Sequence, residues 1–128
     1  MYHDYKGFLE DDEWEEDDCD FVPANAPLYV NYTSGASGPP KGIVRDHGGT
    51  AVALHYAMKN IFNVSMDSVH FAACSLAWDI GHAFLVYGPL LRGAKTVVWE
   101  GDPLYPDPGI LWAIVEQHSV TNLYLNIT

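Results

Sequence analysis

The sequence predicts an α/β fold, in which a mostly parallel sheet carries helices on both faces. Two observations lead to this fold class: strand-like and helix-like segments alternate along the chain, and the strand-like segments are continuous apolar runs. The 128 residues are enough for one ordinary domain. The last predicted strand has no covering helix after it, so we expect a truncated portion of a larger domain.

Residues 1–26 are expected to form an acidic, poorly ordered lead-in. Nine of the seventeen acidic residues lie between positions 10 and 20, and closely spaced like charges resist compaction. A calcium loop is the alternative, but the run lacks the glycine that an EF-hand loop requires. Outside this run the chain is nearly neutral, which predicts no nucleic-acid partner.

A partial domain is predicted over residues 27–128, opening with a short strand at 28–33. That strand ends at the cluster SGASGPPKG, residues 34–42, and a short apolar run follows at 43–45. From Thr50, a suitable N-cap after two glycines, apolar residues recur at three- and four-residue steps. This spacing predicts a helix with one buried stripe.

The next segments continue the alternation. Residues 69–73 are predicted as a strand, and residues 80–91 as a buried helix that Gly88 and Pro89 break or kink. Residues 95–99 are predicted as a third buried strand.

The final pair of elements begins at Asp107 and Pro108, where proline suits an early helix position. His118 is expected at the end of this helix, and residues 120–127 return as a strand.

The two cysteines, Cys19 and Cys74, lack the spacing of a disulfide framework or a metal-binding pair, which predicts a reduced, intracellular chain. The histidines have no metal-ligand spacing either, so no metal site is predicted. The start lacks a signal peptide, and no apolar run approaches the roughly 18 residues of a membrane helix. We therefore expect no membrane partner.

The loop after the first strand combines the parts of a polyphosphate cradle. Hydroxyl groups can donate hydrogen bonds, glycines let the backbone turn and present N–H groups to an anion, and a lysine adds positive charge. The Lys-Gly order excludes a Walker A loop, and an ordinary surface loop is the alternative. The residues concerned are Thr33, Ser34 and Ser37, then Gly35, Gly38 and Gly42, and Lys41.

The motif YTSGASGPPKG resembles the signature of the acyl-adenylate-forming (AMP-binding) superfamily. Its flanks, PLYVNYTSG, GIVRDHGGTAVAL and AWDIGHAFLVYGPLLRGAKTVVWEGDP, are similar to the acetyl- and propionyl-CoA synthetase branch. These flanks disfavour a peptide-synthetase adenylation segment, the other possible branch. The resemblance covers residues 14–128 and implies an internal fragment of the large N-terminal domain.

The resemblance implies an AMP-forming ligase that joins a small carboxylic acid, acetate or propionate, to CoA. ATP, Mg²⁺ and CoA are the implied cofactors and co-substrates, and AMP and pyrophosphate the products. The remainder of the parent enzyme is the implied partner, because the adenine- and ribose-binding motifs and the catalytic lysine lie downstream in the family. No catalytic set is complete in this chain. The implied compartment is the cytosol or the mitochondrial matrix.

The resemblance also assigns two groups of site residues. The ATP phosphate loop, which would bind the β- and γ-phosphates, comprises Thr33, Ser34, Gly35, Ala36, Ser37, Gly38, Lys41 and Gly42. The junction of acyl pocket and CoA tunnel comprises Trp78, Asp79, Ile80, Gly81 and His82. A core position for Trp78 and a packed or capping position for His82 are the alternatives.

Three departures from the family pattern stand out. Ala36 removes a hydroxyl from the loop, Ser75 replaces a usual Asp, and Asp79 places a carboxylate where the family has an apolar residue. An unpaired charge at Asp79 would be costly, so the pocket would be open to water, remodelled or inactive. The alternative function is therefore a non-catalytic remnant or interaction module of the same fold.

Overall fold

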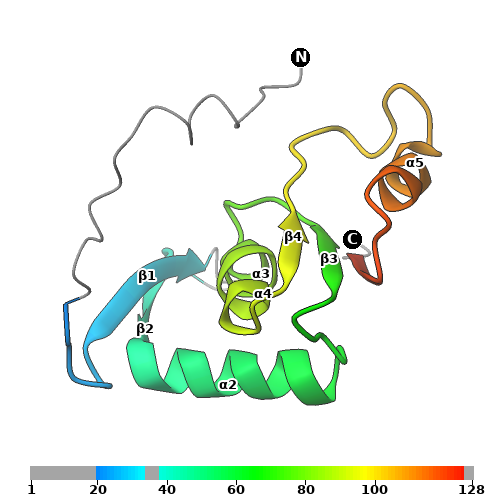
Figure 1. Ribbon diagram of the computed structural model, residues 1–128. Coiled ribbons are helices and arrows are strands. Elements are labelled where there is room, and N and C mark those ends of the chain that lie inside the picture. Colours follow the sequence, from blue (N-terminus) through cyan, green and yellow to red (C-terminus); the bar gives the residue numbers. More distant parts are fainter. Residues whose placement is uncertain (1–19, 34–37, 126–128) are drawn as a thin grey trace, which may run out of the picture.

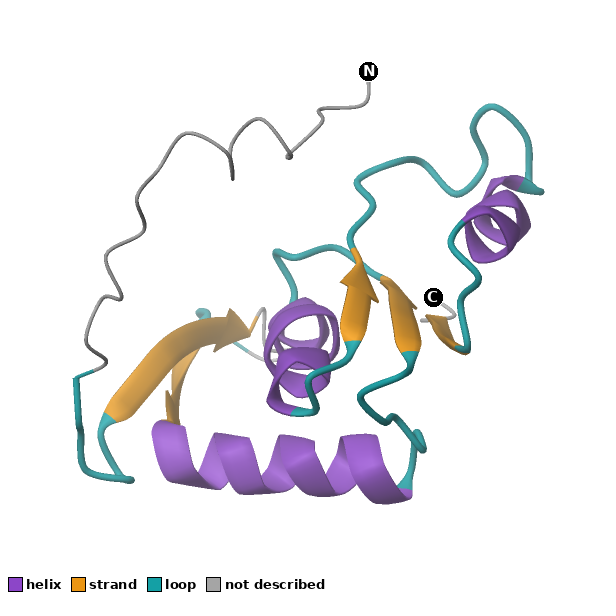
Figure 2. Cartoon of the chain, viewed as in Figure 1, coloured by secondary structure: helices purple, strands orange, loops and turns teal. Residues whose placement is uncertain are grey.

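The computed structural model of the chain (Figure 1) describes residues 20–33 and 38–125. Strands and helices alternate along most of this part of the chain, as Figure 2 shows in orange and purple. The elements are β1 (Pro27–Thr33), β2 (Lys41–Asp46), α2 (His47–Asn60), β3 (Val69–Ala73), α3 (Asp79–Gly81), the π-helix η1 (His82–Tyr87), α4 (Gly88–Leu91), β4 (Lys95–Val97), α5 (Ile110–Gln117) and β5 (Asn122–Leu125).

The first two strands form an antiparallel hairpin, in which Thr33 lies opposite Lys41. β2 is longer than the predicted run at 43–45, because Lys41 and Gly42 of the predicted loop belong to the strand. At Gly42, an added Cβ would lie 3.2–3.3 Å from side-chain atoms of its β1 neighbours. The glycine therefore leaves room for these side chains across the hairpin.

The other three strands form a parallel sheet in the order β4-β3-β5. His70 of the central strand pairs with Thr96 on one side and with Asn122 on the other. The connection from β3 to β4 contains α3, η1 and α4, whereas the connection from β4 to β5 contains α5.

One face of this sheet is covered by η1. The Thr96 hydroxyl donates to the carbonyl of Leu85 at 2.8 Å, and the rings of Phe84 and Tyr124 lie 5.4 Å apart. Phe62, just after α2, packs against the same two rings and against the His70 ring.

The opposite face of the sheet is turned toward α5, and successive side chains of each strand alternate between the two faces. Ala73 and Leu125 on this face share a cavity wall with Leu111 of α5, and Phe71 is fully buried beneath it. The α/β fold class with a parallel sheet is therefore confirmed.

The first long helix begins three residues before the predicted Thr50. Asp46 is its N-cap, and its carboxylate accepts a hydrogen bond from the Gly49 N–H at 2.6 Å. The prediction of Thr50 as N-cap was wrong, because a carboxylate upstream satisfies a free N–H of the first turn. At the same end, the carbonyls of Ala24 and Ala26 accept hydrogen bonds from the first two helical residues.

The predicted buried helix at 80–91 is helical but not uniform. It runs as a short α-turn, a π-helical segment and a last α-turn that begins at Gly88. Gly88 lies close to Met58 of α2, where an added Cβ would come within 2.5 Å of the methionine methyl group. At the predicted break or kink, the winding changes from π-helical to α-helical at Gly88, where the chain also packs closely against α2.

The last elements are shorter than predicted. β4 ends at Val97 and β5 begins at Asn122, while His118 is the C-cap of α5 as expected. Residues 126–127 of the predicted final strand, and residues 1–19 of the predicted lead-in, lie outside the described part. No helix within the described residues has the length and apolar character to cross a membrane.

Candidate functional site

The predicted phosphate loop connects the two strands of the hairpin. Its described residues are Thr33 at the end of β1, Gly38, and Lys41 and Gly42 at the start of β2. Because Thr33 and Lys41 are register partners, a hydroxyl and an ammonium group lie at the two ends of the loop. Ser34, Gly35, Ala36 and Ser37 lie outside the described residues.

Gly38 shows why this loop needs glycine. Its φ is +144°, a conformation that residues with a side chain rarely adopt, and nothing lies within 4 Å of an added Cβ. The requirement is therefore one of backbone conformation and not of crowding.

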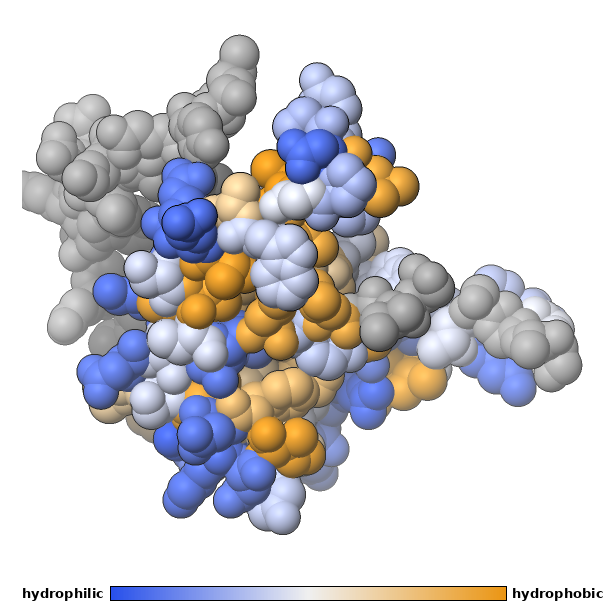
Figure 3. Space-filling model, turned by 90° about the vertical axis from the view of Figure 1, so that its right-hand side faces the viewer, coloured by the Kyte–Doolittle hydropathy of each residue, from blue (hydrophilic) through white to orange (hydrophobic). Residues whose placement is uncertain are grey.

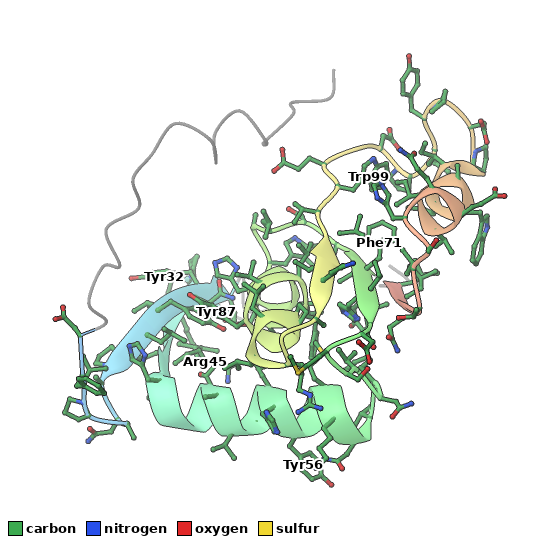
Figure 4. The ribbon with its side chains drawn as sticks, in the orientation of Figure 1. Tyr32, Arg45, Tyr56, Phe71, Tyr87 and Trp99 are labelled. Carbon is green, nitrogen blue, oxygen red and sulfur yellow. The ribbon has the colours of Figure 1, made fainter. Side chains whose placement is uncertain are left out.

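Asp79, at the first position of α3, is bonded to both strands of the hairpin. Its Oδ1 accepts from the Tyr29 hydroxyl at 3.1 Å, and its Oδ2 pairs with the Arg45 guanidinium at 2.9 Å. Asp79 is therefore not an unpaired charge, because Arg45 of β2 supplies its counter-charge. Arg45 and Tyr87 are labelled in this region of Figure 4.

These contacts change two pKa values. Burial alone would raise the pKa of Asp79, but hydrogen bonds from Asn31, Arg45 and Tyr29 outweigh it and lower that pKa. Burial, and next the Asp79 charge, raise the pKa of Tyr29. Asp79 is therefore an anion at neutral pH, with Tyr29 as a neutral donor.

Tyr29 also binds the helices through its ring. It stacks on Tyr87 with ring centroids 5.8 Å apart, and it lies 5.3 Å from the His82 ring. His82 Nδ1 lies 3.1 Å from the Trp78 carbonyl oxygen, a local contact that agrees with the packed alternative for this histidine. Trp78 is 48% exposed, so it is not a core aromatic in the described chain.

Gly81 fixes the turn that precedes α3. An added Cβ would lie 2.2 Å from the Ser75 carbonyl oxygen, so the turn and the helix can approach this closely only with glycine. This contact sets where Trp78 and Asp79 leave the turn. The predicted group Trp78–His82 is thus brought together around one tight junction.

The larger cavity, of about 580 Å³, lies at the carboxyl ends of the parallel strands. Its walls come from the turn after β3, the segment after β4, and α5. Burial raises the pKa of the Cys74 thiol in this wall, which keeps the thiol neutral. The lining residues are Ala73, Cys74, Ser75, Leu76, Ala77, Trp99, Glu100, Gly101, Pro103, Leu111 and Leu125.

The strand order explains the position of this cavity. β4 lies on one side of β3 and β5 on the other, so the two crossover connections leave in opposite directions. The place where the connections of neighbouring strands leave in opposite directions is called a switch point. In open α/β sheets, ligands bind in the crevice at this point, beyond the carboxyl ends of the strands. Figure 4 shows Trp99 and Phe71 in this region, between β3 and α5.

A second cavity, of about 390 Å³, lies between the hairpin, α2 and α3. Asp79 and Ile80 of the predicted acyl-side group line it, together with Tyr29 and Arg45. These two members of the predicted group therefore face the hairpin that bears the loop.

Sequence reasoning missed Tyr29 and Arg45 as partners of Asp79, and it missed the segment from Trp99 to Pro103 as a cavity wall. The pairing had one available signal: Arg45 carries a positive charge on a strand beside the loop. The cavity wall had none, since it depends on the strand order. Within residues 20–33 and 38–125, no group of three or more His, Cys, Asp or Glu side chains is placed to hold a metal ion.

Comparison with known proteins identifies the family. The profile of the AMP-binding enzyme family matches residues 3–126. The chain is 44% identical over 104 residues to propionate–CoA ligase of Escherichia coli. The matched segment covers 81% of this chain and 17% of that protein. It is 41% identical over 120 residues to human acyl-CoA synthetase short-chain family member 3, mitochondrial, covering 88% of this chain and 18% of that protein.

A third relative agrees with these two. Acetyl-coenzyme A synthetase of Pyrobaculum arsenaticum is 41% identical over 107 residues, which cover 84% of this chain and 16% of that protein. The chain thus spans about a sixth of the length of the curated relatives it matches. Both the superfamily and the acetyl- and propionyl-CoA synthetase branch inferred from the motifs are confirmed, and the chain belongs to the AMP-binding enzyme family.

Proposed function

We propose that the chain is part of an AMP-forming short-chain acyl-CoA ligase and supplies its ATP phosphate loop. The whole protein would convert a small carboxylic acid, acetate or propionate, with ATP and CoA to acyl-CoA, AMP and pyrophosphate. Family membership and the names of the relatives support the reaction class. The observation that carries the loop assignment is the hairpin, which sets Thr33 and Lys41 on either side of a glycine-containing turn.

In the first step, a carboxylate oxygen attacks the α-phosphorus of ATP, and the bond from that phosphorus to the bridging oxygen breaks. Pyrophosphate leaves, carrying the negative charge that the loop must stabilise. The hydroxyl groups and backbone N–H groups of the loop would donate to its oxygens, and the Lys41 ammonium would offset its charge. The proposed donors are Thr33, Ser34 and Ser37 through hydroxyls, and Gly35 and Gly38 through the backbone.

In the second step, the CoA thiol loses its proton to solvent and its sulfur attacks the carbonyl carbon of the acyl-AMP. The bond from that carbon to the phosphate oxygen breaks, and AMP leaves. We assign the reacting end of these substrates to the cavity at the strand ends. Its lining turn continues directly into Trp78 and Asp79. Mg²⁺ would neutralise phosphate charge when bound. It would be held chiefly through the phosphates and water, as is usual for this ion.

Binding of radiolabelled pyrophosphate, measured by equilibrium dialysis at low chain concentration, tests the loop assignment. The unsubstituted chain should bind with a sub-millimolar dissociation constant. Lys41→Ala should weaken binding about tenfold, since a charge-assisted contact is lost. Lys59→Ala is the matched control, because Lys59 lies in the last turn of α2, and it should bind as the unsubstituted chain does.

The same measurement distinguishes the proposed function from the alternative one. The loop assignment would be contradicted if the unsubstituted chain bound no pyrophosphate at millimolar concentration. It would also be contradicted if the Lys41→Ala variant bound pyrophosphate as tightly as the unsubstituted chain. That result would favour the non-catalytic remnant or interaction module.

A further inference from the structure

We infer that Asp79 is a positioning residue for the phosphate loop, acting as a latch that holds the β1–β2 hairpin against α3. The latch consists of Asp79, Tyr29 and Arg45. It rests on the proposed function, because it matters for chemistry only where the loop binds phosphate. Its geometry, however, stands on contacts between described residues alone.

The latch contacts both strands at once. The two oxygens of Asp79 have separate partners, the Tyr29 hydroxyl on β1 and the Arg45 guanidinium on β2. Tyr29 and Arg45 are themselves paired across the hairpin, so their side chains lie on the same face of it. One carboxylate therefore fixes the tilt of the whole ribbon and not of a single strand.

The latch is placed symmetrically with respect to the loop. Tyr29 is four residues before Thr33, and Arg45 is four residues after Lys41. At about 3.3 Å per residue, each arm is roughly 13 Å long. A small rotation of the hairpin at the latch therefore moves the loop ends by a larger distance. Misplacement of a binding group by about 1 Å can cost a large part of its effect.

The hairpin needs such an anchor. An isolated two-stranded ribbon is marginally stable at best in water. The Tyr29 ring adds to the anchor by stacking on Tyr87 of η1 and lying beside the His82 ring. Because Asp79 follows Trp78 directly, the latch also sets the spacing between the loop and the predicted acyl-side group.

Asp79→Asn tests the inference, since it removes the charge while keeping the side-chain size. We expect faster amide hydrogen exchange in β1 and β2 but not in β3, and pyrophosphate binding weaker by about threefold to fivefold, as for the loss of an exposed ion pair. Asp67→Asn is the matched control. Asp67 is an exposed carboxylate in the turn before β3, and its substitution should change neither measurement.

A charge exchange separates positioning from a general loss of structure. Arg45→Glu and Asp79→Lys should each weaken pyrophosphate binding, and the double variant should bind more tightly than either single one. The inference alone would be overturned if the losses of pyrophosphate affinity in the two single variants simply added in the double variant. It would also be overturned if Asp79→Asn changed neither the pyrophosphate affinity nor the amide hydrogen exchange of β1 and β2. Absence of pyrophosphate binding in the unsubstituted chain would overturn the proposed function as well.

Discussion

At the residue scale, Asp79 shows that a sequence departure can be compensated by tertiary contacts. The carboxylate is unusual for the family, but Arg45 and Tyr29 satisfy it. Both charged side chains are exposed by 40% or more, so the pair contributes about 1 kcal/mol or less to stability. Its importance lies in orientation, because it ties a strand pair to a helix.

His70 is the opposite case, a polar side chain that the fold buries without a partner. It is fully buried on the central strand, and neither ring nitrogen has a hydrogen-bond partner among the described residues. Burial lowers the pKa of His70 below its ordinary value of 6.5, and it outweighs the smaller, opposite effect of the nearby Phe84 backbone. The ring is therefore neutral in the folded chain at neutral pH.

This burial predicts an acid-sensitive stability. As the pH falls below 6.5, the unfolded chain gains a proton at His70 and the folded chain does not, so the free energy of unfolding decreases until the lowered pKa is reached. His70→Leu should flatten this decrease, measured by urea unfolding between pH 7.5 and pH 5. His118→Gln, at an exposed position, is the control. If the free energy of unfolding of His70→Leu fell with pH as steeply as that of the unsubstituted chain, the prediction would be contradicted.

At the element scale, Pro89 leaves one carbonyl of the π-helical segment without its regular helical donor. Proline has no N–H, so it cannot donate to the carbonyl of Leu85, as the regular α-helical pattern requires. The Thr96 hydroxyl of β4 donates to that carbonyl instead, at 2.8 Å. The strand thus replaces a bond that the helix cannot make, and it fixes η1 against the sheet.

Thr96→Val is therefore expected to destabilise the chain by about 1–2 kcal/mol, because it leaves the Leu85 carbonyl without its hydroxyl donor in a buried place. Chemical unfolding would measure the loss. Thr96→Ser keeps the hydroxyl and should recover most of the stability. If the valine and serine variants were equally stable, the hydroxyl bond would have no measurable role.

At the scale of the whole molecule, the chain leaves many large apolar side chains exposed. Figure 3 shows apolar side chains gathered in the middle of the face on the α5 side. On α2, Val52 is 72% exposed and Tyr56 is 63% exposed, and Tyr56 points away from the rest of the chain (Figure 4). Apolar surface of this extent favours association.

We therefore predict that the chain made alone binds the apolar dye ANS and associates as its concentration rises. The double variant Val52→Glu, Tyr56→Lys should reduce both, because it removes two exposed apolar groups and adds an ion pair one helical turn apart. Dye fluorescence and light scattering would measure this. Gln117→Glu, which adds charge on exposed α5 without removing apolar surface, should have little effect. A dye-free monomer with a sharp melt would contradict the prediction.

The sequence by itself determined the fold class, the family and the order of the elements. These depend on local information: apolar runs predict strands, three- and four-residue spacing predicts helices, and YTSGASGPPKG is a contiguous motif. Boundaries were less secure. The start of α2 was missed because the Asp46 carboxylate, and not the Thr50 hydroxyl, caps the helix. Asp46, Gly48, Gly49 and Thr50 are all residue types found at N-caps, so the local sequence does not choose between them.

Only the tertiary structure decided which residues meet. Asp79 and Arg45 are 34 positions apart, and nothing in either local sequence states that a strand and a helix bring them together. The strand order β4-β3-β5, which creates the cavity at the carboxyl ends, likewise depends on how the crossovers pack. Such contacts arise from the burial of several elements at once, which local sequence patterns do not encode.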